Sequence, residues 1–246
     1  MNKRLRLILS VLVLLLILFS AGFFVWGETA APPMLEALIA MKSDDQVTVT
    51  DSEWLTFAPV NGQSDIGFIF YPGARVDYRA YAPAARQIAE NGFLVVIVRM
   101  PLNLAVFNIN AAEKVVASFP QIKTWAIGGH SLGGSMAAAY AKSHPDTIKG
   151  LALWASYPAS NDDLSQSGLK VVSIFGSLDG LATLQKIEAS RQWLPADTTW
   201  VEIEGGNHAQ FGWYGDQAGD HPPAISRGSQ QRQVITATLG LLERLK

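Results

Sequence analysis

The chain has 246 residues, of which 49% are hydrophobic and 16% are charged, and its formal net charge at pH 7 is -2. This length allows one sizeable hydrophobic core, and the nearly neutral charge gives no electrostatic reason to bind nucleic acid. Because the chain contains no cysteine, disulfides, thiolate metal sites, thiol nucleophiles and lipid attachment through cysteine are excluded.

An apolar segment occupies residues 7–26, after a basic start at residues 1–6 that contains Lys3, Arg4 and Arg6. Twenty helical residues span about 30 Å, which is the thickness of a bilayer core. A cleaved signal peptide usually has a shorter apolar region and a small-x-small cleavage site. We therefore expect an uncleaved transmembrane anchor, with secretion after signal cleavage as the alternative. The early cations place residues 1–6 in the cytoplasm and the remainder on the extracytoplasmic side.

Residues 27–45, with Pro32 and Pro33, are expected to form a stalk, and residues 46–246 a single domain. In this domain short β-rich runs alternate with helical stretches, which is typical of a mostly parallel sheet with helices on both faces. The first two strands are expected to form an antiparallel hairpin. The sequence thus predicts an α/β fold with strands near 46–50, 53–58, 66–71, 93–98, 124–128, 151–154, 171–175 and 199–203, and helices near 81–91, 111–118, 135–143 and 231–245.

A glycine-flanked serine follows the strand predicted at 124–128, in Gly129-His130-Ser131-Leu132-Gly133. A serine on a sharp strand-to-helix turn projects toward a substrate, and glycine two positions before and after it lets neighbouring chain approach closely. The G-x-S-x-G pattern alone is a weak signal, but the strand before it and the helix after it supply the required context. Ser131 is therefore the predicted nucleophile, and the side chain of His130 is expected to point away from it.

A serine nucleophile needs a histidine as base, and the chain has four histidines. His208 follows the last predicted strand, whose carboxyl end lies at the same sheet edge as Ser131. His208 is therefore the preferred base, and His221, in the loop 213–228, is the reserve candidate. A position at a helix end is a sufficient explanation for His144.

The acid that orients the histidine is predicted to be Asp179, which directly follows a predicted strand. Asp179 also lies between Ser131 and His208 in the chain, which is the order found in α/β-hydrolases. Asp162 and Asp163, after the preceding strand, are the less favoured alternatives.

These motifs resemble the α/β-hydrolase superfamily, and in particular its lidless dienelactone-hydrolase-like group, the alpha/beta hydrolase fold-5 family. Two further stretches are similar to this group, Phe70-Tyr71-Pro72-Gly73-Ala74-Arg75-Val76 and Arg99-Met100-Pro101-Leu102-Asn103-Leu104-Ala105. The resemblance covers about residues 47–246. It implies hydrolysis of an ester, lactone or similar acyl bond without a cofactor. A dienelactone hydrolase proper uses a cysteine nucleophile, which this chain lacks.

The oxyanion of the reaction needs two backbone donors. The amide of Leu132, directly after the nucleophile, is the first. By the resemblance, the amide of Ala74, in the loop after the third strand, is the second.

Five residues near strand ends are candidates for the substrate pocket. Arg75 and Arg99 could favour an anionic substrate, although solvated ion pairs are the simpler interpretation. Trp154, Tyr157 and Trp213 could line the pocket, with ordinary aromatic packing as the alternative.

The predicted function is hydrolysis of a small-molecule acyl substrate through an acyl-enzyme, without a metal or cofactor. Asp216, Asp220 and His221 have no recognised metal-ligand spacing, so a solvated loop is preferred there. A catalytically idle membrane-anchored binding protein of the same fold and an acyltransferase with the same triad remain as alternatives.

Overall fold

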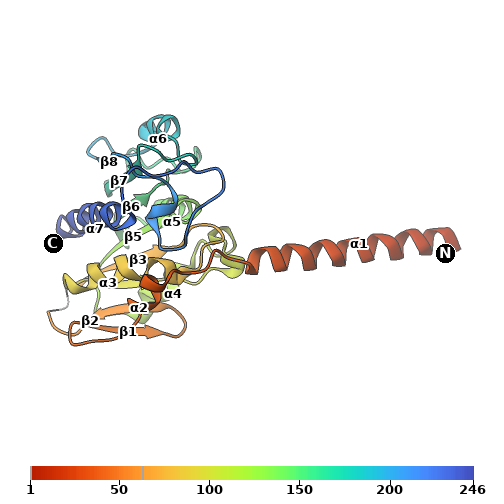
Figure 1. Cartoon of the computed structure of the whole chain (residues 1–246), viewed down its shortest axis with the longest axis horizontal. Helices are drawn as coiled ribbons and strands as arrows, with labels where there is room; N and C mark the ends of the chain where they lie inside the picture. Colours follow the sequence, from red (N-terminus) through yellow and green to blue (C-terminus); the bar gives the residue numbers. More distant parts are fainter. Residues whose placement is uncertain (1, 63) are drawn as a thin grey trace.

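The computed structural model describes residues 2–62 and 64–246, so Met1, within the predicted basic start 1–6, and Gln63 lie outside the described residues. Helix α1 (Lys3–Glu28) projects away from the rest of the chain (Figure 1). Its most apolar 18-residue window has a mean hydropathy of 2.9, and no residue of that window is buried. By length and composition, α1 is therefore able to cross a membrane.

An eight-stranded sheet forms the centre of the domain, in the order β1-β2-β4-β3-β5-β6-β7-β8. Strand β2 runs antiparallel to β1 and β4, and the other neighbouring pairs are parallel. The predicted mostly parallel sheet with an antiparallel hairpin at one edge is confirmed. The strands are β1 (Val47–Asp51), β2 (Leu55–Pro59), β3 (Ile66–Tyr71), β4 (Leu94–Ile97), β5 (Thr124–His130), β6 (Ile148–Trp154), β7 (Lys170–Gly176) and β8 (Thr199–Ile203).

Helices cover both faces of the sheet. Because successive residues of a strand point to opposite faces, Phe68 and Phe70 of β3 belong to one buried cluster and Ile69 to the other. The first cluster lies under α3 (Ala82–Glu90) and α7 (Arg227–Glu243), and the second under α4 (Ala111–Ser118) and α5 (Leu132–Ser143). Two shorter helices are α2 (Leu35–Ile39) and α6 (Leu184–Ser190).

The segment 27–45, which we expected to be a stalk, packs in part on the domain. The amide of Ala31 donates to the carbonyl of Arg75 (2.7 Å), and Ala31 accepts from the amide of Asp77 (3.1 Å). Ala37 and Ala40 lie three positions apart, on one side of the α2 turn, and both are buried. The small alanine side chains allow this close packing, so the segment is not a free tether.

The carboxyl ends of the parallel strands lie along one edge of the sheet, and this edge carries the loops of interest. Ser131 follows β5, Asp179 follows β7 and His208 follows β8. The last turn of α1 contacts the 3-10 turn Pro101–Asn103, which follows β4 at the same edge. The three predicted catalytic residues therefore lie at the same edge of the sheet as the base of α1. Figure 1 shows α1 leaving the domain on the side away from the C-terminus.

Candidate active site

Ser131 lies at the junction of β5 and α5 with a φ of 52°, a left-handed conformation that residues other than glycine rarely adopt. Two hydrogen bonds hold its backbone there. Its amide donates to the carbonyl of Trp154 (3.0 Å), and its carbonyl accepts from the Ser156 hydroxyl (2.6 Å). The surroundings thus maintain the strained turn that presents the serine side chain.

The flanking glycines are required by close contact between α5 and the loop after β3. A Cβ at Gly129 would lie 2.6 Å from the carbonyl oxygen of Tyr71. A Cβ at Gly133 would overlap the carbonyl oxygens of both Tyr71 and Pro72. The glycine spacing seen in the sequence therefore lets α5 start directly beside this loop.

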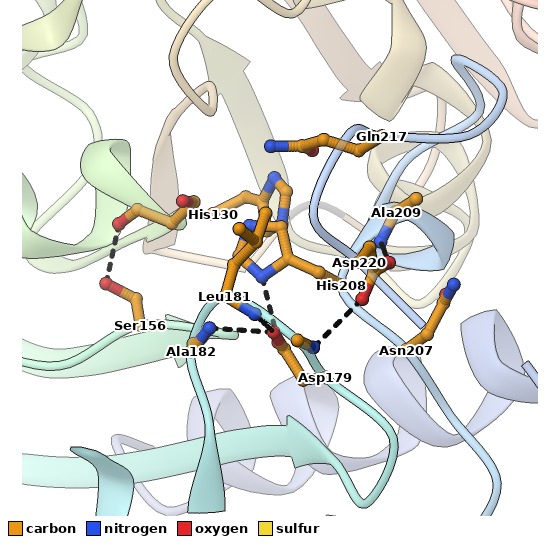
Figure 2. A network of polar contacts seen from close by, with 12 residues as sticks. His130, Ser156, Asp179, Leu181, Ala182, Asn207, His208, Ala209, Gln217 and Asp220 are labelled. Atoms are coloured by element: carbon orange, nitrogen blue, oxygen red, sulfur yellow. Dashed lines mark hydrogen bonds and ion pairs between the residues drawn. The ribbon is translucent and has the colours of Figure 1, made fainter. Parts of the chain in front are cut away.

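His208 and Asp179 form a buried pair. His208 Nδ1 lies 2.8 Å from Asp179 Oδ2, and both side chains are almost inaccessible to solvent (Figure 2). Asp179 Oδ1 accepts from the amides of Leu181 (2.8 Å) and Ala182 (2.7 Å). Because an ionised carboxylate is an acceptor only, Nδ1 carries the proton of this pair, and Nε2 is the basic nitrogen of the neutral ring.

Ser131 and His208 both line one cavity of about 250 Å³. His208 Nε2 is buried and makes no hydrogen bond to any described residue, so it is available to a proton donor. Within the described part of the chain, Ser131 and His208 make no hydrogen bond to each other. The other lining residues are Leu132, Ser135, Ala155, Ser156, Tyr157, Leu181 and Ala182.

The two predicted oxyanion donors lie on either side of the contact at Gly133. Leu132 is the first residue of α5, where an amide has no partner within the helix, and it lines the Ser131 cavity. The Ala74 amide has no hydrogen-bond acceptor among residues 2–62 and 64–246. However, Ala74 lines a neighbouring hollow of about 440 Å³, together with Arg75 and Tyr214, rather than the Ser131 cavity.

His130 contacts His208, the candidate base. The sequence did not predict this contact. The His130 ring lies 4.5 Å from that of His208, centroid to centroid. Its Nδ1 lies 2.8 Å from the hydroxyl of Tyr81, which also accepts from the amide of Gly73 (3.0 Å). The hydroxyl of Tyr81 thus links the amide of Gly73 to Nδ1 of His130. Burial, and then the neighbouring His208, hold the pKa of His130 well below its ordinary value.

A family model described as the alpha/beta hydrolase family matches residues 67–232. The chain belongs to the α/β-hydrolase family. No curated protein matches the chain. The model is similar to the esterase domain of a Rhodothermus marinus protein (14% identity, 81% of this chain and 98% of that chain, TM-score 0.62). It is also similar to a putative dienelactone hydrolase from Klebsiella pneumoniae (14%, 80% and 97%, 0.57) and a thermophilic esterase from Thermogutta terrifontis (12%, 81% and 92%, 0.56). At these identities the likeness shows the fold alone.

In this α/β-hydrolase, Asp220 joins the loop that carries Asp179 to the loop that carries His208. Its Oδ1 accepts from the amides of Gly180 (3.1 Å) and His221 (2.9 Å), and its Oδ2 accepts from the amide of Ala209 (2.8 Å). The expectation of a solvated loop is therefore wrong for Asp220, while Asp216 is exposed. Among the described residues, no three His, Cys, Asp or Glu side chains form a group that could hold a metal ion.

The alternative catalytic residues lie elsewhere. The reserve base His221 is exposed and accepts through its carbonyl from Asn207 Nδ2 (2.8 Å). Asp163 is exposed and accepts from the amide of Ser165 (2.9 Å). Asp162 lines a separate hollow beside α5. The buried carboxylate–histidine pair beside the Ser131 cavity is thus formed by Asp179 and His208.

Of the aromatic pocket candidates, Tyr157 lines the Ser131 cavity and two do not. Trp154 is 1% exposed, donates from Nε1 to Thr238 Oγ1 (3.1 Å) and packs under α7. Trp213 is half-buried, and its backbone bonds to Ala80 and Met34. Neither side chain lines the cavity, and Trp154 belongs instead to the buried cluster under α3 and α7.

The two arginine candidates do not line the Ser131 cavity either. Arg99 pairs with Asp51 (2.5 Å) and lies over the ring of Tyr78. Arg75 donates from Nε to the carbonyl of Trp26 (3.1 Å) at the end of α1. Their cations are thus engaged by the protein itself, and the idea that they select an anionic substrate is not supported by their positions.

Proposed function

We propose that this α/β-hydrolase is a serine hydrolase that cleaves an ester, lactone or similar acyl bond of a small molecule. The observation that carries this proposal is the buried hydrogen bond between His208 Nδ1 and Asp179, combined with the shared cavity of His208 and Ser131. This arrangement supplies a nucleophile, a base with its free nitrogen on Nε2, and an acid that orients the base. The modest cavity suits a short acyl group or a single chain entering from its mouth.

In the proposed reaction Ser131 Oγ attacks the substrate carbonyl while His208 Nε2 takes its proton. The amides of Leu132 and Ala74 stabilise the resulting oxyanion. His208 then gives the proton to the leaving alcohol, which departs and leaves an acyl group on Ser131. A water molecule, deprotonated by His208, releases the acid and restores the serine. Asp179 stabilises the imidazolium in both steps and remains ionised.

We further propose that residues 7–26 anchor the domain to a membrane, with the domain on the extracytoplasmic side. Support for an uncleaved anchor comes from the joint between α1 and the domain. Asn103 Nδ2 donates to the carbonyl of Gly27 (3.0 Å), and Arg75 Nη2 donates to that of Thr29 (2.9 Å). Signal cleavage near Gly27 would remove these contacts. Intact mass of the mature protein and retention in membranes after carbonate washing test this proposal.

The test of the catalytic proposal uses the full chain in detergent micelles, a fluorophosphonate probe, peptide mapping and hydrolysis of p-nitrophenyl acetate. Label on Ser131 and ester turnover are expected, and Ser131→Ala should lose both. Ser135→Ala is the matched control, because Ser135 lines the same cavity but its hydroxyl donates to the carbonyl of Tyr157 (2.6 Å). A folded protein without label would favour an idle binding protein, and ester products formed with an added alcohol would favour an acyltransferase.

A further inference from the structure

We propose that the catalytic edge of the domain rests on the surface of the lipid bilayer, and that Ser131 acts on amphiphilic esters held in that surface. The proposal rests on the proposed function and on α1 as a membrane anchor. Its occupant is a lipid surface, because the apolar face concerned is continuous with the apolar surface of α1.

Helix α1 leaves the domain from the sheet edge that carries the loops after β3 and β4. Arg75 follows β3 and Asn103 follows β4, and both bond to the last turn of α1. Ser131 follows the adjacent parallel strand β5. The carboxyl ends of these strands meet at one edge. The C-terminal end of α7 lies on the opposite side of the domain (Figure 1). A membrane crossed by α1 therefore faces the edge that carries Ser131.

Close contacts fix the joint between the end of α1 and the loops that carry Arg75 and Asn103. Gly27 is buried, and a Cβ there would lie 2.8 Å from Cβ of Leu102. The Arg75 guanidinium lies 4.4 Å from the ring centroid of Trp26, while Asn103 bonds to the carbonyl of Gly27. These contacts satisfy carbonyl groups that the end of a helix leaves without partners. The joint thus holds the domain in one orientation relative to α1.

Two exposed apolar residues beside the joint, Val106 and Phe107, form an apolar rim. Val106 and Phe107 belong to the 3-10 turn Ala105–Phe107 and are 43% and 51% exposed. The Phe107 ring meets the ring of Phe23 edge to face, with centroids 6.3 Å apart. Phe23 lies within the apolar segment 7–26. Phe107 is therefore at the level of the membrane boundary, where exposed apolar side chains enter lipid.

A hollow lies between the end of α1 and the loop of Ala74. The hollow of about 440 Å³ is bounded by Thr29 and Ala31, just after α1, and by Ala74. Ala74 is a proposed oxyanion donor. An ester held at headgroup level in this hollow would thus lie next to a residue proposed to stabilise the oxyanion. The exposed Asp216 also lines this hollow, which suits a polar headgroup rather than a purely apolar molecule.

The placement is tested without any catalytic readout. The chain has no cysteine, so Phe107→Cys creates a single site for an environment-sensitive nitrobenzoxadiazole label on the full chain in phosphatidylcholine vesicles. Quenching by a headgroup-attached quencher is expected at position 107. The control is Val60→Cys, because Val60 is 47% exposed and follows β2, which ends at the opposite edge of the sheet. Equal quenching at the two positions would overturn the placement.

The substrate class is tested with two esters of one leaving group, 4-methylumbelliferyl acetate in solution and 4-methylumbelliferyl oleate in the same vesicles. Replacing both Val106 and Phe107 by serine removes the apolar rim, so the oleate rate should fall about tenfold relative to the acetate rate. Val60→Ser should change neither rate. An unchanged ratio in the rim variant overturns the substrate class. Hydrolysis of neither ester by the unaltered chain would refute the proposed function and the substrate class, while quenching at position 107 would still support the placement.

Discussion

The imidazole rings of His130 and His208 lie with their centroids 4.5 Å apart and their planes tilted by 44°, although His130 ends β5 and His208 follows β8. Each ring has a separate partner on its Nδ1, the hydroxyl of Tyr81 for His130 and the carboxylate of Asp179 for His208. A positive charge on either ring disfavours a charge on the other. A neutral His130 is therefore suited to stand beside a base that becomes charged during the reaction.

Stability should fall on acidification because of His130. Its pKa in the folded protein is well below the value of about 6.5 expected after unfolding. Below that pH the unfolded chain takes up a proton that the folded protein excludes, which lowers the free energy of unfolding by up to about 1.4 kcal/mol per pH unit. The contribution of His130 is thus complete above about pH 6.5 and lost as the pH falls toward the folded pKa.

This dependence is measured as the melting temperature of the full chain in detergent micelles between pH 7.5 and pH 5. His130→Asn cannot take up this proton and should show a shallower pH dependence. His144→Asn is the control, because His144 is half-buried against the ring of Tyr140 and its Nε2 lies 3.2 Å from the exposed carboxylate of Glu113. Identical slopes for the unaltered chain and His130→Asn would contradict the prediction.

Asp179→Asn should lower kcat by about 10⁴-fold, as loss of the acid does in comparable triads. The amide cannot stabilise the imidazolium and favours the wrong tautomer of His208. The rate of p-nitrophenyl acetate hydrolysis measures this effect. Asp163→Asn, at an exposed aspartate that accepts from the amide of Ser165, should retain its activity. An Asp179→Asn enzyme with more than a tenth of the activity would rule out this role.

Asp220→Ala should impair both activity and stability. The change leaves the amides of Gly180 and Ala209 without their acceptor, and an unpaired buried donor costs about 1–3 kcal/mol. Loosening these amides lets the acid and base loops move apart, so kcat should fall together with the melting temperature. Asp216→Ala, in the same loop, is the matched control. Equal kcat values for the two variants would show that Asp220 does not position the pair.

Gly133→Ala should disturb the oxyanion loop. The added methyl group would overlap the carbonyl oxygens of Tyr71 and Pro72, and such overpacking costs about 1–3 kcal/mol or more. Loss of ester turnover and a lower melting temperature are expected. Gly240→Ala in α7 has open space around its Cβ and should be neutral or stabilising by up to about 1 kcal/mol. A fully active Gly133→Ala enzyme would be incompatible with the contact seen here.

The sheet and the positions of Ser131, Asp179 and His208 could be predicted because local patterns determine them. Alternating and continuous apolar runs identify strands, and residues directly after parallel strands must share an edge. The same reasoning failed for Trp154, because a place at the end of a strand does not say which face the side chain takes. Trp154 lies on the face under α7, where it packs against Phe70 with ring centroids 4.5 Å apart.

Contacts between distant parts of the chain could not be predicted from the sequence. Arg75 bonds to the carbonyl of Thr29, 46 positions earlier, and no local pattern predicts that pairing. The contact of His130 with His208 could have been inferred in part. The two-residue period of β5 places His130 on the same face as Ala126, which belongs to the cluster under α3 and α7. The loop after β8 closes over that face, and this closure was not apparent from the residues.

Helix α1 continues without interruption into its joint with Arg75 and Asn103, so the helix and the domain turn together. One residue inserted before Trp26 would leave the joint unchanged. It would rotate all earlier side chains by about 100° around the helix axis and displace them by about 1.5 Å relative to the domain. The number of residues in α1 therefore sets both the rotation of the domain about the helix axis and its distance from the membrane. A flexible linker would make both independent of that number.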